Sequence, residues 1–412
     1  MDRSPEDQLE LIRANTVEII PEEELLEKLR SGRPLRVKLG VDASGPDIHL
    51  GHAVVLRKLR LFQDLGHVAV MIVGDFTGMI GDPSGRLDTR RQLTREQVEK
   101  NIANYKQQVF KIVDPEKTEF RYNSEWLGKL TPEQIMRLAA THTVAQLLAR
   151  DDFAKRYQAQ QPIGLHEFLY PLFQGYDSVA VQADVEIGGT DQTFNFLVAR
   201  ELQRADPLGE PQEPQCIVTF GLLVGTDGVE KMGKSLNNYI GIMEPPGEIF
   251  GKLMSIPDAA IQQYFELCTD VPADEIAQMA ADMKSGALNP RDAKRRLGRE
   301  IVTLYHSSEA AKQADATFMS VFSTAREQTR EDYEAVAEEI AIPESLRGKA
   351  VWISSALAEL GLASSRGEAR RLIQGGGVYF DERRVSDPKE EIELKEGMLL
   401  RIGKRRVARL VG

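Results

Sequence analysis

Two short stretches of the chain combine residue types that bind phosphate groups. The first, DASGPDIHLGH (residues 42–52), carries His49 and His52 three residues apart, with Gly51 between them. An apolar repeat follows, so this stretch marks the start of a helix, where unpaired amides and the peptide dipole favour an anion. Two imidazoles on one helical face would then point at one ligand. The alternatives are a buried or solvent-facing histidine pair and a metal site.

The second stretch, GVEKMGKSLNN (residues 228–238), places Lys231 and Lys234 on either side of Gly233, followed by Ser235. Taken alone, such a loop is more often a solvated surface segment. Combined with the HLGH turn, a lysine loop hinged on glycine could close over a polyphosphate and stabilise its developing charge. The two stretches together favour a nucleotide over a metal, and no further Cys or His lies at finger-like spacing.

A third stretch, YPLFQGYD (residues 170–177), places Tyr170, Gln174 and Asp177 at i, i+4 and i+7, which is one polar stripe on a helix. A buried carboxylate at the end of this stripe is unfavourable unless it finds a donor, and a phenol hydroxyl is such a donor. The stripe therefore favours a tyrosine over a phenylalanine as ligand. The alternative is a capped core helix with an exposed acid.

Alternating strands and helices would position these residues. LRVKLGVD (35–42) predicts a strand, apolar spacing predicts a helix over 50–65, and VAVMIVG (68–74) predicts a buried strand. The same order returns with strands predicted at 178–187 and 215–225, and a helix at 193–203 between them. Apolar strands of this kind suggest a parallel sheet, whose ligands bind beyond the carboxyl ends of the strands.

We therefore expect an α/β protein of several domains. Residues 1–243 are predicted to form a Rossmann-like parallel-sheet catalytic domain with a connective insertion. Strand signals then vanish, and residues 244–330 are predicted to form an α-helical domain. An acidic linker, 331–350, leads to a small α+β domain at 351–412.

Composition narrows the function classes. The formal net charge is -11, yet residues 351–412 hold 12 Lys and Arg against 9 Asp and Glu, which is a weak sign of a nucleic-acid-facing end. Cys216 and Cys268 lack CxxC spacing, so neither a disulfide framework nor a thiolate metal site is expected. No apolar run approaches twenty residues, and the acidic start lacks the order of a secretory signal. We expect a cytoplasmic protein with no membrane and no DNA partner.

The joint occurrence of HLGH and KMGKS resembles the two signatures of class I aminoacyl-tRNA synthetases. The polar stripe, GDFTGMIGDPSGR (74–86) and EIGGTDQ (186–192) are similar to tyrosyl-tRNA synthetases of the bacterial type. The resemblance implies activation of L-tyrosine by ATP, accompanied by Mg²⁺, and transfer of the tyrosyl group to the terminal ribose of tRNA(Tyr). It also implies a homodimer and no structural metal. The helical domain would bind the anticodon.

The resemblance also implies a role for each matching residue. Those at the phosphates and the reacting centre are His49, His52, Ser44, Lys231, Lys234, Ser235, Arg86 and Arg90. Those around tyrosine are Asp177, Tyr170, Gln174, Asp82, Gln192, Asp42 and Lys38. Those at the remainder of ATP are Gly51, Gly189, Asp191, Leu39, Met232 and Gly233.

The basic C-terminal end resembles the small RNA-binding module named after a ribosomal protein, the S-four fold, in ARRLIQGGGVYFDERRV (369–385). Ser365 and Glu368 could form a capping box at the start of its helix. The alternative is a solvated charged face. The tRNA contacts are predicted at Arg366, Arg370, Arg371, Lys404, Arg405 and Arg406.

The chain departs from the family pattern in a few places. In many bacterial members a Tyr stands at the position of Lys38 and makes a second phenol contact, and a Cys at that of Leu39 reaches the ribose. A second bacterial branch carries this Lys together with Glu186. Ala43 and Ser44 replace the usual Pro and Thr, and Gly233 replaces a commoner Ser.

Three other functions compete with this interpretation. A small-molecule nucleotidyltransferase or ligase with the same HxGH turn would have no need of the helical region and the basic tail. A non-catalytic RNA-binding relative would have lost the lysine loop or the polar stripe, and both are present. The tryptophanyl enzymes usually lack the RNA-binding tail and vary the HLGH turn.

Overall fold

The computed structural model describes residues 3–42, 47–82, 96, 105–322, 333–334, 337–381, 383–385, 387–403 and 406–411. The chain divides into two compact units. The first comprises Met1–Glu244 and Ile256–Pro290, and the second comprises Pro245–Ser255 and Arg291–Gly412.

A six-stranded sheet forms the centre of the first unit, with strand order β1-β6-β5-β2-β3-β4. Its strands are β1 (Glu18–Ile20), β2 (Arg36–Asp42), β3 (Val68–Gly74), β4 (Thr118–Tyr122), β5 (Val185–Gly189) and β6 (Cys216–Phe220). The pairs from β6 to β4 are parallel, as the sequence predicts, whereas β1 runs antiparallel to β6 at one edge. The strand order reverses on either side of β2, which makes the carboxyl end of β2 the switch point where such sheets bind ligands.

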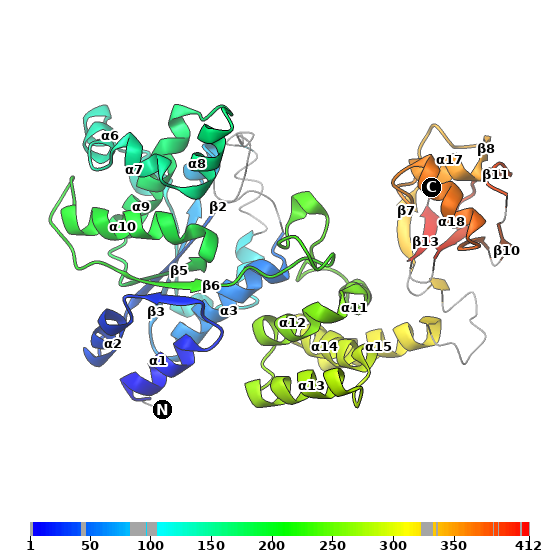
Figure 1. Cartoon of the computed structure of the whole chain (residues 1–412), viewed down its shortest axis with the longest axis horizontal. Coiled ribbons are helices and arrows are strands. Elements are labelled where there is room, and N and C mark those ends of the chain that lie inside the picture. The colour runs from blue at the N-terminus through cyan, green and yellow to red at the C-terminus, as the bar shows by residue number, and fades with distance from the viewer. Residues whose placement is uncertain are drawn as a thin grey trace. The chain divides into compact units, whose positions relative to one another are not determined.

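Helices cover both faces of this sheet, which is why its strands are apolar throughout (Figure 1). Figure 1 shows α1, α2 and α3 on one face and α9 and α10 on the other. In β3 every residue from Ala69 to Gly74 is buried. The bounds are α1 (Pro5–Arg13), α2 (Glu22–Arg30), α3 (Leu50–Asp64), α9 (Tyr170–Ala180) and α10 (Thr193–Ala205).

The helix α3 confirms the predicted helix after the HLGH turn. His49 is its N-cap residue, and the Leu50 amide donates to the carbonyl oxygen of Ile240 at 2.9 Å, which ties the helix start to a distant loop. The helix buries an apolar face that includes Leu59 and Phe62. It ends before Gly66, whose φ of +94° lies in the left-handed region that ends helices.

The predicted strand at 178–187 is wrong in its first half. Helix α9 continues to Ala180, and β5 begins only at Val185. The amide of Ala183 donates to the carbonyl oxygen of Ser178 at 3.0 Å, and Gln182 has a φ of +51°, so this segment closes the helix. Val179 is buried against α6 and α10, and Val181 is buried against β3, which is why their apolar pattern resembles that of a strand.

The predicted strand at 215–225 is too long. Strand β6 ends at Phe220, and beyond it Val224 only pairs in an isolated bridge with Lys231. The turn expected at Thr-Asp-Gly is present, because the Gly228 amide donates to the Gly225 carbonyl oxygen at 2.9 Å. The lysine loop therefore folds back along the segment that follows β6, with Lys231 opposite Val224.

Short α-helices lie between β4 and α9, and short 3-10 helices lie in several connecting segments of the chain. Two of them carry capping boxes, with Thr131 and Thr143 accepting from the amides of Gln134 and Gln146. Their bounds are α5 (Ser124–Leu127), α6 (Pro132–Ala139), α7 (Val144–Leu148) and α8 (Asp151–Gln158). The 3-10 helices are η1 (Thr77–Met79), η2 (Pro115–Lys117), η3 (Leu165–Leu169), η4 (Thr190–Gln192), η5 (Lys234–Leu236) and η6 (Asp258–Ala260).

Gly175 allows α9 and α10 to pack closely. A Cβ atom at this position would lie 3.2 Å from the Cα atom of Ala199 in α10. That distance is shorter than an ordinary van der Waals contact, so a side chain here would push the two helices apart. The close packing fixes the polar stripe of α9 relative to the start of α10.

The helical region expected after residue 244 is confirmed in the described residues. Helices α12 (Ile261–Cys268) and α13 (Ala273–Ser285) belong to the first unit. Helices α11 (Pro246–Ser255), α14 (Pro290–Tyr305) and α15 (Ser308–Phe322) belong to the second, apart from Pro290. The finer division of the chain into four parts stays a prediction.

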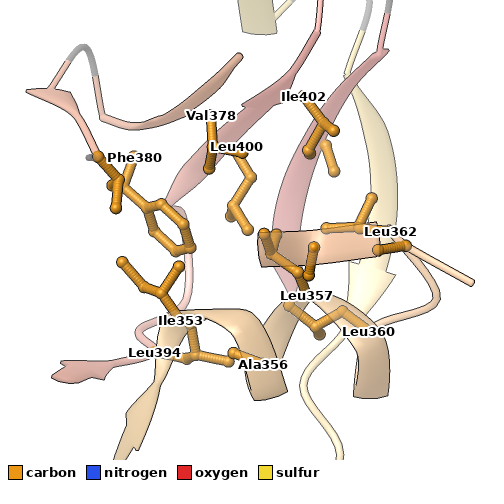
Figure 2. Close-up of a cluster of buried hydrophobic side chains, with 14 of the residues drawn as sticks. Ile353, Ala356, Leu357, Leu360, Leu362, Val378, Phe380, Leu394, Leu400 and Ile402 are labelled. Atoms are coloured by element: carbon orange, nitrogen blue, oxygen red, sulfur yellow. The ribbon is translucent and has the colours of Figure 1, made fainter. Parts of the chain in front are cut away.

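The C-terminal residues form a small α+β domain, as predicted. A sheet of order β10-β9-β12-β13-β7 and a β8-β11 pair surround two helices. Figure 2 shows Ile353 and Leu357 of α17 facing Phe380 and Leu400 of the sheet. The bounds are β7 (Glu338–Ala341), β8 (Ala350–Trp352), α17 (Ile353–Glu359), α18 (Arg366–Gln374), β9 (Val378–Phe380), β10 (Arg383–Arg384), β11 (Glu391–Glu393), β12 (Leu399–Ile402) and β13 (Arg406–Val411).

Strand β7 lies within residues 331–350, which the sequence suggests as a linker. It pairs in parallel with β13, with Leu410 opposite Ile340. The segment therefore adds a strand to the C-terminal sheet, in addition to connecting it. Its alternating apolar residues, Ile340 and Ile342, are the signal that the acidic composition conceals.

Candidate functional site

The carboxyl ends of the parallel strands bring the three chemical stretches together. Asp42 is the last residue of β2, the loop after β3 leads to Asp82, and Asp191 lies two residues beyond β5. The ends of parallel strands meet at one edge of a sheet, so residues that are distant in the sequence become neighbours there. The candidate site lies at this edge of the first unit.

The two histidines of the HLGH turn stack on each other. Their ring centroids lie 3.8 Å apart with an interplanar angle of 22°. His49 is 6% exposed, and its buried Nδ1 has no hydrogen-bond partner among the described residues. A Cβ atom on Gly51 would lie 3.1 Å from that Nδ1, so only glycine leaves the ring this space. Nδ1 is thus available to a ligand.

Burial and a nearby ammonium group keep both imidazoles neutral. Burial, with a smaller contribution from Lys234, lowers the pKa of His49 to about 4. Burial, then His49 and Lys234, lower the pKa of His52 well below its usual value. Neutral imidazoles at neutral pH can donate to or accept from a ligand without adding charge.

The lysine loop lies beside the HLGH turn. A Cβ atom on Gly51 would be 3.7 Å from the Cβ of Met232, and His49 pairs with Gly241 in an isolated bridge. Burial lowers the pKa of Lys234, while Asp47 opposes that shift. The lysine ammonium group and the histidine pair are therefore close enough to act on one ligand.

Lys231 is held by a carboxylate from the loop after β5. Its Nζ lies 3.2 Å from Asp191 Oδ2, and the two side chains are 43% and 23% exposed. Gly189 precedes this carboxylate, and a Cβ there would lie 2.6 Å from Asp191 Oδ1. The ion pair links the lysine loop to the segment that follows β5.

Asn238 fixes the shape of the lysine loop. Its Oδ1 accepts from the Gly233 amide at 2.8 Å, and its Nδ2 donates to Asp227 Oδ2 at 2.6 Å and to the Lys231 carbonyl oxygen at 3.2 Å. Met232 is buried within this loop, and Ser235 lies in η5. A single amide side chain therefore holds the backbone on both sides of Met232.

The predicted polar stripe lies on α9, where the sequence places it. The Tyr170 hydroxyl donates to Asp42 Oδ2 at 3.0 Å. Gln174 Nε2 donates to Gln192 Oε1 at 3.3 Å, and Gln192 Nε2 donates to Asp82 Oδ2 at 2.9 Å. Tyr170 is thus paired with Asp42, and Gln174 is linked through Gln192 to Asp82, so both stripe residues bond to other residues predicted around tyrosine.

Asp177, at the end of the stripe, is a buried carboxylate with two side-chain donors. The Trp126 Nε1 donates to its Oδ1 at 2.7 Å, and the Asn123 Nδ2 donates to its Oδ2 at 3.3 Å. The side chain is 4% exposed. Burial raises the pKa of Asp177 to about 7, whereas Lys38 and the two donors act in the opposite direction.

A chain of polar contacts joins the two ends of the stripe. Thr77 donates to Asp42 Oδ1 at 2.9 Å and accepts from Asn123 Nδ2 at 3.0 Å. Because Asn123 also donates to Asp177, the carboxylates of Asp42 and Asp177 are connected through two intervening side chains. The resulting group is held from β2, η1, β4 and α9 at once.

Several residues of this site were not identified from the sequence. Asn123 directly follows β4 at the same sheet edge as Asp42, and recognising TEFRY as a strand would have revealed it. Trp126 is one of only two tryptophans. Asn195 donates to Gln174 Oε1 at 2.8 Å and accepts from Arg150 at 3.1 Å, and neither residue carries a local signal.

The structure contradicts the placement of Lys38 among the residues that contact tyrosine. Its side chain is 0% exposed, and its Nζ forms a 2.7 Å ion pair with Glu186. Side chains alternate along a strand, so Lys38 extends beneath α9 while Leu39, also buried, faces the other side of the sheet. A second phenol contact from Lys38 is therefore ruled out in this conformation.

Some predicted site residues lie outside the described residues. They are Ser44, Arg86, Arg90, Lys404 and Arg405.

The predicted RNA-facing arginines fall into two groups. Those at positions 366, 370 and 371 are exposed on α18, a helix that Ser365 caps by accepting from the Glu368 amide at 3.2 Å. The Glu368 carboxylate accepts from the Ser364 amide at 2.6 Å, so the expected capping box is only half formed. Arg406 differs, because its Nε lies 2.6 Å from Glu338 of β7.

Among the residues that the structure describes, no three His, Cys, Asp or Glu side chains gather in a way that could hold a metal ion. Within the same residues, no helix has the length and apolar character needed to cross a membrane.

Two family descriptions match the chain. That of tRNA synthetases class I (W and Y) matches residues 30–323, and that of the S4 domain matches residues 351–398. The tyrosine–tRNA ligase of Moorella thermoacetica is 52% identical over 407 residues, which are 98% of this chain and 95% of that protein. The tyrosine–tRNA ligase of Thermotoga maritima is 49% identical over 409 residues, 99% of this chain and 98% of that protein.

Solved structures share the fold at lower identity. The tyrosyl-tRNA synthetase of Archaeoglobus fulgidus, complexed with L-tyrosine, has a TM-score of 0.61 and 22% identity, covering 76% of this chain and 99% of that chain. A C-terminally truncated mitochondrial tyrosyl-tRNA synthetase of Aspergillus nidulans has a TM-score of 0.62 and 21% identity, covering 78% and 94%.

The fluorescence of Trp126 should report the ionisation of Asp177. In a Trp352→Phe background Trp126 is the only tryptophan, and its indole N–H donates to the carboxylate that titrates. We expect a fluorescence transition with a midpoint near pH 7, because burial raises the pKa of Asp177 to about 7. Asp177→Asn should abolish it. A midpoint near pH 4, or a neutral transition that survives in Asp177→Asn, would contradict this assignment.

Proposed function

We propose a mechanism for this chain from one premise, that it belongs to the tyrosyl-tRNA synthetases of class I. As a tyrosine–tRNA ligase it uses tyrosine and ATP to charge tRNA. In the first step a carboxylate oxygen of tyrosine attacks the α-phosphorus of ATP, and pyrophosphate leaves. In the second step a hydroxyl of the terminal ribose of tRNA(Tyr) attacks the carbonyl carbon, and AMP leaves. No protein nucleophile is needed, so positioning and charge stabilisation supply the rate.

The Asp177 carboxylate is proposed to accept a hydrogen bond from the phenol hydroxyl of tyrosine. It is the single observation that carries the proposed tyrosine specificity, because a buried carboxylate with only two side-chain donors retains acceptor capacity for a third. A phenylalanine would leave that charge desolvated and unpaired, which is strongly unfavourable. Tyrosyl-tRNA synthetases are themselves the reference example of such rejection, at about 100,000-fold.

The other end of the stripe is proposed to hold the ammonium group of tyrosine. Tyr170, Gln174 and Asp82 present a hydroxyl, an amide oxygen and a carboxylate. Asp42 orients Tyr170 by accepting from its hydroxyl, and Gln192 links Gln174 to Asp82. Acceptor atoms of this kind match a cation with three N–H donors.

The HLGH turn and the lysine loop are proposed to bind the phosphates of ATP. The free Nδ1 of His49 and the amino end of α3 supply neutral donors, while Lys231, Lys234 and Ser235 act on the departing pyrophosphate. Gly51, Met232 and Gly233 are proposed to line the nucleotide. Outside the described residues, Ser44, Arg86 and Arg90 are proposed to assist.

Nucleotide binding is proposed to open the ion pair between Lys231 and Asp191. Asp191, with Gly189 beside it, would receive the ribose hydroxyls, and Lys231 would exchange the carboxylate for a phosphate oxygen. Both side chains are partly exposed, so the pair costs little to separate. The buried Leu39 would support this region from the sheet below.

Mg²⁺ is proposed to accompany ATP as a substrate complex. Hard phosphate oxygens retain this cation with one or two carboxylates and several waters. Asp47, whose charge acts on Lys234, would suit such a role. The cation would neutralise charge on the leaving pyrophosphate.

The C-terminal S4 domain is proposed to contact tRNA(Tyr) through α18. Arg366, Arg370 and Arg371 are exposed on that helix and can neutralise phosphates. Arg406 is proposed to contribute less, because Glu338 already neutralises it. Lys404 and Arg405 complete the proposed set, and the helices after residue 244 are proposed to bind the anticodon.

A homodimer and a cytoplasmic location are also proposed. Exposed apolar side chains in the insertion between β4 and α9 support a partner surface: Met136 is 70% exposed, Val144 62%, Tyr157 66% and Leu165 81%. Exposed apolar surface of this kind is typical of interfaces. Because tRNA is charged where proteins are synthesised, the cytoplasm is the proposed location.

The tyrosine pocket is tested by amino-acid-dependent exchange between pyrophosphate and ATP. Tyrosine alone among the amino acids should stimulate the wild-type chain. Asp177→Asn should lower the ratio of kcat/KM for tyrosine to that for phenylalanine by about 10- to 100-fold, the worth of a hydrogen bond to a charged group. Asp184→Asn is the matched control. Asp184 is also buried, but it directly precedes β5 and therefore lies at the amino ends of the parallel strands, opposite the candidate site. An unchanged ratio in Asp177→Asn would remove Asp177 from this role.

The phosphate site is tested by Lys234→Ala. We expect the rate of tyrosyl-adenylate formation to fall by about 100-fold, since the ammonium charge acts mainly as pyrophosphate departs. The affinity for tyrosine should change little, which single-turnover kinetics and equilibrium dialysis can separate. Lys155→Ala, on an exposed ion pair of α8, should leave both unchanged. A large loss of tyrosine affinity with a normal rate would refute the proposed role.

A further inference from the structure

A buried ion pair lies directly beneath the helix that carries the polar stripe. Lys38 of β2 and Glu186 of β5 are partners in the parallel register of these strands. The Lys38 Nζ is 2.7 Å from Glu186 Oε1, and both side chains are 0% exposed. Nothing in the proposed chemistry requires either charge, so their role needs its own explanation.

Every donor of the Lys38 ammonium group has a partner. Besides Glu186, it donates to Ser178 Oγ at 2.8 Å and to the Gln174 carbonyl oxygen at 3.1 Å. Ser178 in turn donates to Glu186 Oε2 at 3.1 Å, and Gln215 donates to the same oxygen. The Lys38 ammonium group is therefore fully hydrogen-bonded and held in one geometry.

Stability alone is a weak reason for such a pair. Desolvation of two charges offsets much of their attraction, and apolar replacements of similar volume are often as stable. The position of the pair is more informative. Gln174 and Ser178, the two α9 residues that Lys38 contacts, stand three residues before and one residue after Asp177.

The Lys38 charge acts on the Asp177 carboxylate. Burial raises the pKa of Asp177 to about 7, Lys38 lowers it, and Glu186 raises it by a smaller amount. Among the described residues, the charged and titratable groups around Asp177 include Lys38 and Asp42 of β2 and Glu186 of β5. Tyr170 lies on the same helix, and the Arg121 Cζ lies 5.4 Å from the centroid of the Trp126 ring. Lys38 thus counteracts burial where a neutral carboxyl would be a weaker acceptor than the carboxylate.

We propose that Lys38 is a positioning residue for tyrosine selection: it fixes α9 through the Gln174 carbonyl oxygen and keeps the Asp177 carboxylate ionised, so that this carboxylate accepts a hydrogen bond from the phenol hydroxyl. Glu186 supplies the counterion of the buried Lys38 ammonium group, which would otherwise be desolvated without a partner charge. This inference rests on the proposed role of Asp177. It also explains how a chain with Lys in place of a second phenol contact retains selectivity.

Lys38→Met and the double variant Lys38→Met/Glu186→Gln test this inference. Both remove the ammonium charge at similar volume, and the double variant leaves no unpaired charge if the single one fails to fold. In the Trp352→Phe background, the Trp126 fluorescence midpoint should rise by about one pH unit. The KM for tyrosine should rise by about tenfold at pH 6.5 and recover at high pH, with kcat little changed.

Phenylalanine activation and Lys28→Met serve as controls. Activation of phenylalanine should fall less than that of tyrosine in the variants, since phenylalanine depends on the position of α9 but does not use the carboxylate charge. Lys28 is 4% exposed, donates to the Pro214 carbonyl oxygen at 2.9 Å and lies 3.6 Å from Glu213. It is a similarly buried lysine on α2 that contacts the residues preceding β6, away from the carboxyl ends of the strands, so Lys28→Met should leave the midpoint and the KM profile unchanged.

Two outcomes separate the failures. If the folded Lys38 variants keep the wild-type midpoint and the wild-type KM profile, the pair is only structural and this inference is overturned. If instead Asp177→Asn leaves the preference for tyrosine over phenylalanine intact, the proposed role of Asp177 itself fails, whatever the Lys38 variants show.

Discussion

The burial of one carboxylate, that of Asp177, is the constraint on which the tyrosine site depends. Two donors, Trp126 and Asn123, partly offset the loss of water around it, and its pKa still rises to about 7. In the proposed role, a ligand hydroxyl would complete its coordination, and a ligand without one would leave it unsatisfied. The same constraint explains why a charged lysine lies beneath α9, where an apolar residue would fit the sheet equally well.

The parallel sheet makes this arrangement possible, because it aligns the ends of strands that are far apart in the sequence. Asp42 follows β2, Asn123 follows β4 and Asp191 follows β5, so one edge collects acceptors for an amino acid and a nucleotide. The HLGH turn adds neutral imidazoles there, and the lysine loop adds positive charge. Polar contacts from four elements fix the tyrosine end, whereas an exposed ion pair holds Lys231 at the phosphate end. In the proposed mechanism the rigid part would select the amino acid, and the looser part would rearrange as pyrophosphate leaves.

Local patterns predict much of this site and fail where contacts are long-range. Tyr170, Gln174 and Asp177 fall on one helix because their spacing is helical, and α3 begins at the HLGH turn as its apolar repeat requires. Asn195 and Arg150 could not be found this way, since only the fold brings them to Gln174. The buried pattern of Val179 and Val181 is compatible with helix or strand, which explains the error at 178–187. The prediction that Lys38 contacts tyrosine is wrong, because the position of a residue in its strand does not reveal that its side chain pairs with Glu186 of another strand.

A crystal structure of this chain with a non-hydrolysable tyrosyl-adenylate analogue tests the central claim most directly. The phenol oxygen should lie within hydrogen-bond distance of an Asp177 oxygen, with Trp126 and Asn123 still bound to that carboxylate. The adenylate should extend from there to Asp191 and the HLGH turn. A phenol bound away from Asp177, or a nucleotide that reaches neither His49 nor the lysine loop, would contradict it.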